Sequence, residues 1–178
     1  MPTTQEFLIR RLTDMGQATY DYFAALPDAH YAQPVYLGGD QWTPHEILAH
    51  FISAERQFLH SLKEVLAGRP TVPDDFDIQA FNETDVPAIA TGCSRADLLA
   101  AFHAARAETI ALVAPLTDDQ LALIGRHPWL GSMRLEEFIK FIYRHNQMHE
   151  RDIKKAIQLG SPIPEGQAAS PQMPPRAA

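Results

Sequence analysis

The chain has 178 residues, 46% of them hydrophobic and 21% charged, which is ordinary for one globular domain with a sizeable core. Its formal net charge of −7 argues against a surface that binds nucleic acid or an anionic membrane. No apolar run approaches the ~18 residues of a membrane span. The first six residues, MPTTQE, lack the layout of a secretory signal, and the single cysteine, Cys93, fits a reducing compartment. We therefore expect a cytoplasmic protein that contacts neither nucleic acid nor membrane.

The N-terminal part of the chain predicts two amphipathic helices. The first is expected from Thr3 to about Leu26, because Thr3 and Glu6 form a capping-box pattern and apolar residues then recur every three or four positions. The second is expected to begin at Thr43 in the sequence TPHE, which combines a cap residue, a proline at the first helical position and an acid that can reach back. Gly68 is expected to end it.

The remainder predicts two more long helices. Residues 69–92 hold three prolines and are expected to form a long loop. A third helix is expected from Ser94 to about Leu116. Residues 127–131 are expected to be a loop, and a fourth helix is expected over residues 134–159.

Together these elements predict an all-α fold, an up-down four-helix bundle with a long crossover connection between helices two and three. The bundle domain is expected to span residues 1–160. Residues 161–178 hold five prolines and few large apolar residues, so they are expected to be a disordered extension. No pair of strands is expected.

The fourth helix carries two histidines where its apolar stripe should be. His145 and His149 continue the spacing of three and four set by Phe138 and Ile142. Imidazoles four residues apart lie on one face and can converge on a metal ion. Asp152, on the same stripe, could accept the N–H of His149 or steady a bound water.

Two other interpretations of this pair were weighed. Histidines four apart are often an exposed coincidence or core residues bonded to other groups. The pair also resembles the metalloprotease pattern H-E-x-x-H, but Asn146 stands where the glutamate base should be, so that interpretation fails on its chemistry.

A third ligand is expected from the second helix. His50 falls on the inward stripe, three residues after Ile47 and four before Ala54. The other histidines are expected at the surface, at a helix start or in loops. Three nitrogen ligands with the remaining positions open describe a site with catalytic potential rather than a closed structural one.

Other polar residues are weaker candidates. Glu46, one turn before His50, could be an outer-sphere acceptor or a base, although its capping role is the stronger interpretation. Glu55 is expected to be a solvated flank. Asn82 could lie at the mouth of the site, and Trp129 could line it.

Several stretches resemble the DinB-like (YfiT-type) superfamily of metal-dependent proteins. They are WTPHEILAHFISAERQFL, FNETDVPA, LLAAFHAARAETIALVAPLTDDQL, HPWLGSMRLEEFI and RHNQMHERDIKKAI, and they cover nearly the whole chain before residue 161. The resemblance implies an up-down bundle with a three-histidine site, whose ligands fall on His50, His145 and His149. It also makes a homodimer plausible.

The resemblance leaves three functions open. Some members look like S-transferases or isomerases that use bacillithiol, mycothiol or glutathione, and others have been called metal-dependent hydrolases. We expect a divalent metal, Zn²⁺ in the first place with Ni²⁺, Mn²⁺ or Fe²⁺ as alternatives, and a small-molecule substrate or low-molecular-weight thiol. The first hypothesis is metal-activated thiol transfer, the second is hydrolysis by metal-bound water, and the third is a non-catalytic metal- or ligand-binding stress protein.

Overall fold

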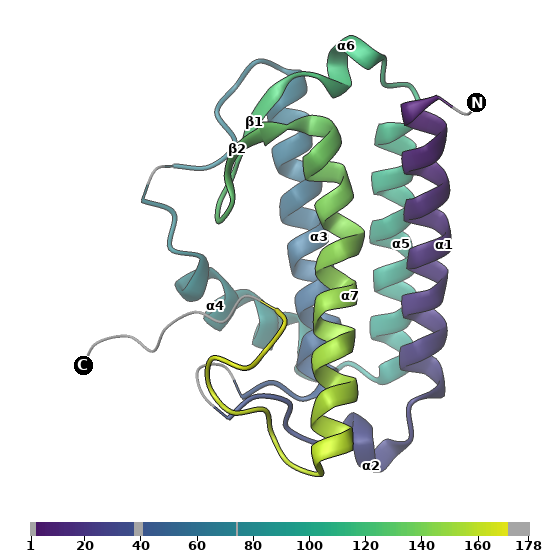
Figure 1. The fold of residues 1–178 in the computed structure, drawn as a ribbon, viewed down its shortest axis with the longest axis vertical. Coiled ribbons are helices and arrows are strands. Elements are labelled where there is room, and N and C mark those ends of the chain that lie inside the picture. Colours follow the sequence, from purple (N-terminus) through teal and green to yellow (C-terminus); the bar gives the residue numbers. More distant parts are fainter. Residues whose placement is uncertain (1–2, 38–40, 74, 171–178) are drawn as a thin grey trace.

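The computed structural model describes residues 3–37, 41–73 and 75–170 (Figure 1). In chain order its elements are α1 (Thr4–Ala25), α2 (Asp28–Tyr31), α3 (Pro44–Leu66), α4 (Ile78–Ala90), α5 (Arg95–Val113), α6 (Asp118–Leu121), β1 (Ile124–His127), β2 (Gly131–Arg134) and α7 (Leu135–Leu159).

Local sequence signals set the ends of the bundle helices. The side chains of Thr3, Thr43 and Ser94 each accept a hydrogen bond from the first turn of the following helix, and an acid in that turn completes a capping box. Helix α7 ends at Gly160, whose φ of 64° is the left-handed conformation that glycine adopts without strain.

The four long helices α1, α3, α5 and α7 form a bundle in which α1 and α3 each lie against both α5 and α7 (Figure 1). Phe51 and Glu55 of α3 contact Phe102 and Arg106 of α5 in the same order, so these two helices are parallel. The predicted four-helix bundle and its long crossover are confirmed. Because the crossover returns the chain to its starting end, the helix directions run down, up, up, down rather than in strict alternation.

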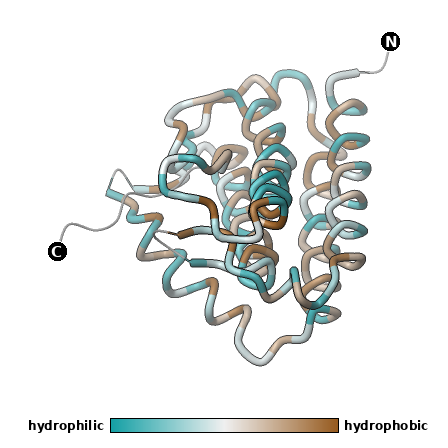
Figure 2. Tube along the Cα trace, turned by 60° about the horizontal axis from the view of Figure 1, so that its bottom comes forward, coloured by the Kyte–Doolittle hydropathy of each residue, from teal (hydrophilic) through white to brown (hydrophobic). Residues whose placement is uncertain are grey.

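The interior of the bundle is apolar and falls into two clusters along its length, one around Phe51 and Phe102 and the other around Phe58 and Phe138. Figure 2 shows hydrophobic and hydrophilic residues alternating along the helices, as expected when one face of each is buried. No described helix is both long and apolar enough to cross a membrane.

The crossover contains a helix that the sequence analysis did not predict. Helix α4 begins at Asp77, whose side chain accepts the N–H of Ala80 at 2.9 Å. Pro87 lies in its last turn, so only one internal hydrogen bond is lost there. Val86 and Ala90 are buried in the core, and this packing stabilises a helix whose prolines favoured a loop.

The prediction that no strands pair is also wrong. Residues 127–131, expected to be a loop, form the turn of an antiparallel hairpin in which Ile124 pairs with Arg134 and His127 with Gly131. The hairpin packs closely on the end of α3. A Cβ added to Gly125 would lie less than 3.0 Å from Val65 Cγ2.

The predicted disorder after residue 160 does not hold for residues 161–170. Ile163 is only 1% exposed and packs in the core cluster around Phe51. One well-placed isoleucine thus offsets the low hydrophobicity of this segment. Residues 171–178 of the predicted tail lie outside the described residues.

Candidate metal centre

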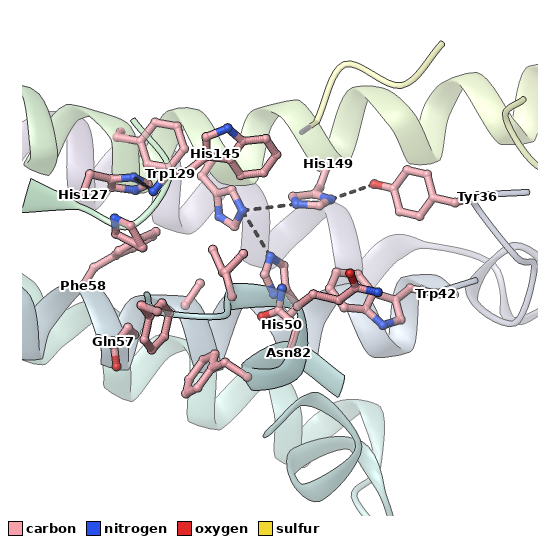
Figure 3. Close-up of a pocket in the computed structure, with 17 residues that line it drawn as sticks. Tyr36, Trp42, His50, Gln57, Phe58, Asn82, His127, Trp129, His145 and His149 are labelled. Atoms are coloured by element: carbon pink, nitrogen blue, oxygen red, sulfur yellow. Dashed lines mark hydrogen bonds between the residues drawn. The ribbon is translucent and has the colours of Figure 1, made fainter. Parts of the chain in front are cut away.

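Three histidine rings meet in the interior between α3 and α7 (Figure 3). His50 comes from α3, and His145 and His149 come from successive turns of α7. The Nε2 atom of His145 lies 3.2 Å from Nε2 of His50 and 3.2 Å from Nε2 of His149. All three side chains are buried. The structure therefore brings together the three residues that the sequence singled out.

Burial keeps these imidazoles uncharged. Loss of solvent lowers the pKa of His50, His145 and His149 well below the usual value, and each ring also opposes protonation of its neighbour. A neutral imidazole carries one N–H and one lone pair. Each ring can therefore offer a lone pair to a cation without first losing a proton.

A tyrosine and a carboxylate hold the outer edge of His149. The hydroxyl of Tyr36 lies 2.7 Å from His149 Nδ1 and donates to Asp152 Oδ2 at 3.3 Å. Since the tyrosine proton is directed at the carboxylate, the hydroxyl oxygen accepts the Nδ1–H of His149, and the lone pair of His149 lies on Nε2. Burial and Asp152 raise the pKa of Tyr36, so its proton is retained. Asp152 therefore acts on His149 through Tyr36, not directly as the sequence analysis expected.

The donor set fits a divalent cation. Nδ1 of His50 and Nδ1 of His145 are buried without a hydrogen-bond partner among the described residues, while the Nε2 atoms crowd together. One ligand atom from each of the three histidines lies within 4.8 Å of the others. An ion bound between the Nε2 atoms would take up all three lone pairs and leave positions open for a substrate.

The histidines form one wall of a pocket whose other walls come from the crossover and the hairpin (Figure 3). The described residues that line it are Tyr36, Trp42, His50, Ala54, Gln57, Phe58, Phe76, Ile78, Gln79, Phe81, Asn82, His127, Pro128, Trp129, Phe141, His145 and His149. The predictions that Asn82 and Trp129 lie at the site are confirmed. No aspartate or glutamate belongs to this described lining.

Comparison with known proteins agrees with this architecture. The sequence matches the DinB superfamily over residues 11–153. The chain belongs to the DinB superfamily. Among solved structures it is similar to YfiT from Bacillus subtilis, described as a probable metal-dependent hydrolase with an unusual four-helix bundle topology, at 21% identity and a TM-score of 0.64 over 88% of each chain. This likeness confirms the fold. The comparison with curated proteins found no match.

One pocket residue of this DinB-superfamily chain was missed by the sequence analysis, which placed His127 in an exposed loop. Its side chain is 2% exposed, and Nδ1 accepts the backbone N–H groups of Trp129 and Leu130, each at 3.1 Å. These bonds place the ring proton on Nε2, which is buried without a partner among the described residues. Burial lowers the pKa of His127 to about 4. The sequence HPW, with a histidine before a proline turn, is the available signal for such a cap.

Two acids lie elsewhere than the site. Glu46 accepts the N–H of Thr43 at 2.9 Å and the Thr43 hydroxyl, so it caps α3 and is not part of the described pocket lining. Glu55, expected to be solvated, is 2% exposed and pairs with Arg106 through contacts of 2.6 Å and 3.0 Å. The prediction for Glu55 is wrong because its partner lies on α5, 51 residues away.

Proposed function

We propose that this protein is a divalent-metal-dependent enzyme that activates a small thiol for transfer to an electrophile, with His50, His145 and His149 holding the ion. The observation that carries the proposal is the convergence of three buried, uncharged imidazoles on a pocket whose described lining contains no carboxylate. The membership of the DinB superfamily supports the metal, and the lining supports the choice of nucleophile.

The missing carboxylate favours a thiol over water. A bound divalent cation lowers the pKa of a thiol or water beside it and so supplies a nucleophile near neutral pH. A thiol begins at a pKa of about 8.5, against about 15.7 for water, so it gives up its proton to solvent without a neighbouring base. Metal-dependent hydrolases of the H-E-x-x-H type instead rely on a glutamate base beside the ion.

The pocket residues suit the two halves of such a reaction. The thiolate sulfur would form a bond to an electrophilic carbon, and the leaving group would depart with the electron pair of the broken bond. Phe58, Phe81 and Phe141 supply apolar walls that exclude water. The Nε2–H of His127 and the carboxamide of Asn82 provide hydrogen-bonding groups that can orient polar atoms of the substrate.

Elemental analysis tests the metal site first. Freshly purified protein should hold about one divalent ion per chain, with zinc favoured over nickel, manganese or iron because it accepts both imidazole and thiolate. His149→Ala should lose most of this metal. His60→Ala, which changes an exposed histidine, should not. Equal metal content in all three proteins would refute the ligand assignment.

A thiol panel tests the chemistry. Glutathione, bacillithiol and mycothiol are offered separately with the electrophile monochlorobimane, and thioether formation is followed by fluorescence. At least one thiol should react faster with the metal-loaded protein than with buffer, and treatment with a chelator should remove that acceleration. Rates equal to those in buffer for every thiol would contradict thiol transfer.

Hydrolysis is the second candidate, favoured by the similarity to YfiT, which is described as a probable metal-dependent hydrolase. A panel of activated esters and amides, with metal-loaded and chelator-treated protein, distinguishes it from thiol transfer. If the ion binds tightly and neither panel is turned over, the chain is a non-catalytic metal-binding protein. The homodimer stays a prediction, to be tested by sedimentation equilibrium.

A further inference from the structure

The segment after α7, residues 161–170, is fixed on both sides of Tyr36. The backbone N–H of Ile163 donates to the carbonyl of Val35 at 2.8 Å, and the N–H of Leu37 donates to the carbonyl of Ile163 at 3.0 Å. The Ile163 side chain is buried in the same core cluster as Tyr36. The position of Tyr36 therefore depends on this docked segment.

The end of the same segment closes over Asp152, which is 1% exposed. The N–H groups of Ala169 and Ser170 donate to its two carboxylate oxygens at 2.6 Å and 2.9 Å. The hydroxyl of Ser170 lies 3.1 Å from the hydroxyl of Tyr36. A buried carboxylate requires such donors, so undocking would deprive Asp152 of two of them and Tyr36 of a neighbour.

We propose that residues 161–170 form the outer part of the metal site, and that their docking is coupled to metal binding through Tyr36 and His149. Tyr36 holds His149 at 2.7 Å and keeps the lone pair of that ring on Nε2, toward the other two histidines. When the segment undocks, this imidazole loses its orientation and its tautomer preference. Coupling between two binding events is reciprocal, so the ion stabilises the docked segment by the factor by which docking raises the affinity for the ion.

The inference rests on the proposed ligand set but not on the thiol chemistry. It is tested on full-length protein by measuring the Zn²⁺ affinity in competition with a chromophoric chelator. Ile163→Asp places a charge at a buried position and should undock the segment, lowering the affinity by about 10- to 100-fold. Ser170→Ala should lower it by a smaller factor. Gln167→Asp adds the same charge at an exposed position of the segment and should leave the affinity within about twofold.

Hydrogen exchange on the unmodified protein provides a second measurement, which decides the question even where Ile163→Asp fails to fold. Zn²⁺ should slow exchange at the amides of Ile163, Ala169 and Ser170, all of which donate hydrogen bonds in the docked segment. Unchanged exchange at these amides in zinc-bound protein would overturn the inference, as would a folded Ile163→Asp variant with unchanged affinity. If the unmodified protein binds no Zn²⁺, the ligand assignment itself fails, and the proposed function fails with it.

Discussion

Acid should destabilise the metal-free protein through His127, by an amount that can be calculated. The ring is buried among Phe58, Phe138 and Phe141, and its Nδ1 already accepts two backbone N–H groups, so a second ring proton costs both hydrogen bonds and solvation. These effects lower the pKa of His127 from 6.5 to about 4. The unfolded chain therefore binds more protons than the folded one between these values. Stability is fully present above pH 6.5 and falls as the pH drops toward 4.

Between about pH 7 and about pH 4.5 this difference in proton binding amounts to about 2 kcal/mol of unfolding free energy. The substitution His127→Asn tests it, because the asparagine oxygen can still accept the two N–H groups of the turn while the titrating ring is gone. Urea unfolding of chelator-treated protein, followed by circular dichroism at both pH values, should show about 2 kcal/mol less acid destabilisation in this variant than in the unmodified protein. His103→Asn, at an exposed position, serves as the control. Equal losses in the unmodified protein and His127→Asn, within about 0.5 kcal/mol, would refute the assignment of a neutral buried ring.

Three further outcomes are expected from the packing and the metal site. Arg106→Met should cost about 3–5 kcal/mol in urea unfolding because it leaves Glu55 buried and unpaired, whereas the double replacement of Arg106 and Glu55 by Met should cost much less; a similar cost for both would contradict this. Gly125→Ala should cost about 1–3 kcal/mol through the clash with Val65, and adding Val65→Ala should restore part of the lost melting temperature if that clash is the cause. Zn²⁺ at about 100 times its dissociation constant should raise the unfolding free energy by about 2.7 kcal/mol. That increment should vanish in His50→Ala and persist in no chelator-treated sample.

The features that local sequence encodes were predicted well. Helix starts at Thr3, Thr43 and Ser94 are set within one turn by a cap residue and its partner, so a single stretch of sequence suffices. The convergence of the histidines followed from helical spacing, because His145 and His149 share one face and His50 lies on the inward stripe of its own helix. Once the helices pack as a bundle, such positions must meet in its interior.

The features that depend on distant partners were missed. Glu55 looks solvated until Arg106, on another helix, is placed beside it. Tyr36 stands in an irregular stretch with no periodicity to mark it, and its role appears only when it meets His149, 113 residues further on. The docked segment after residue 160 rests on Ile163, a single apolar residue among prolines, whose burial no composition average could indicate.

The way α4 is attached separates two tasks of the molecule. Its second half anchors in the core through Val86 and Ala90, while Phe81, Asn82 and the residues before them face the pocket. Substitutions in this front portion would therefore remodel the chamber that receives a reactant while sparing the imidazole cluster and the bundle. A scaffold divided in this manner can acquire new substrate preferences by changing a few side chains of one connecting segment, without rebuilding its ion-binding machinery.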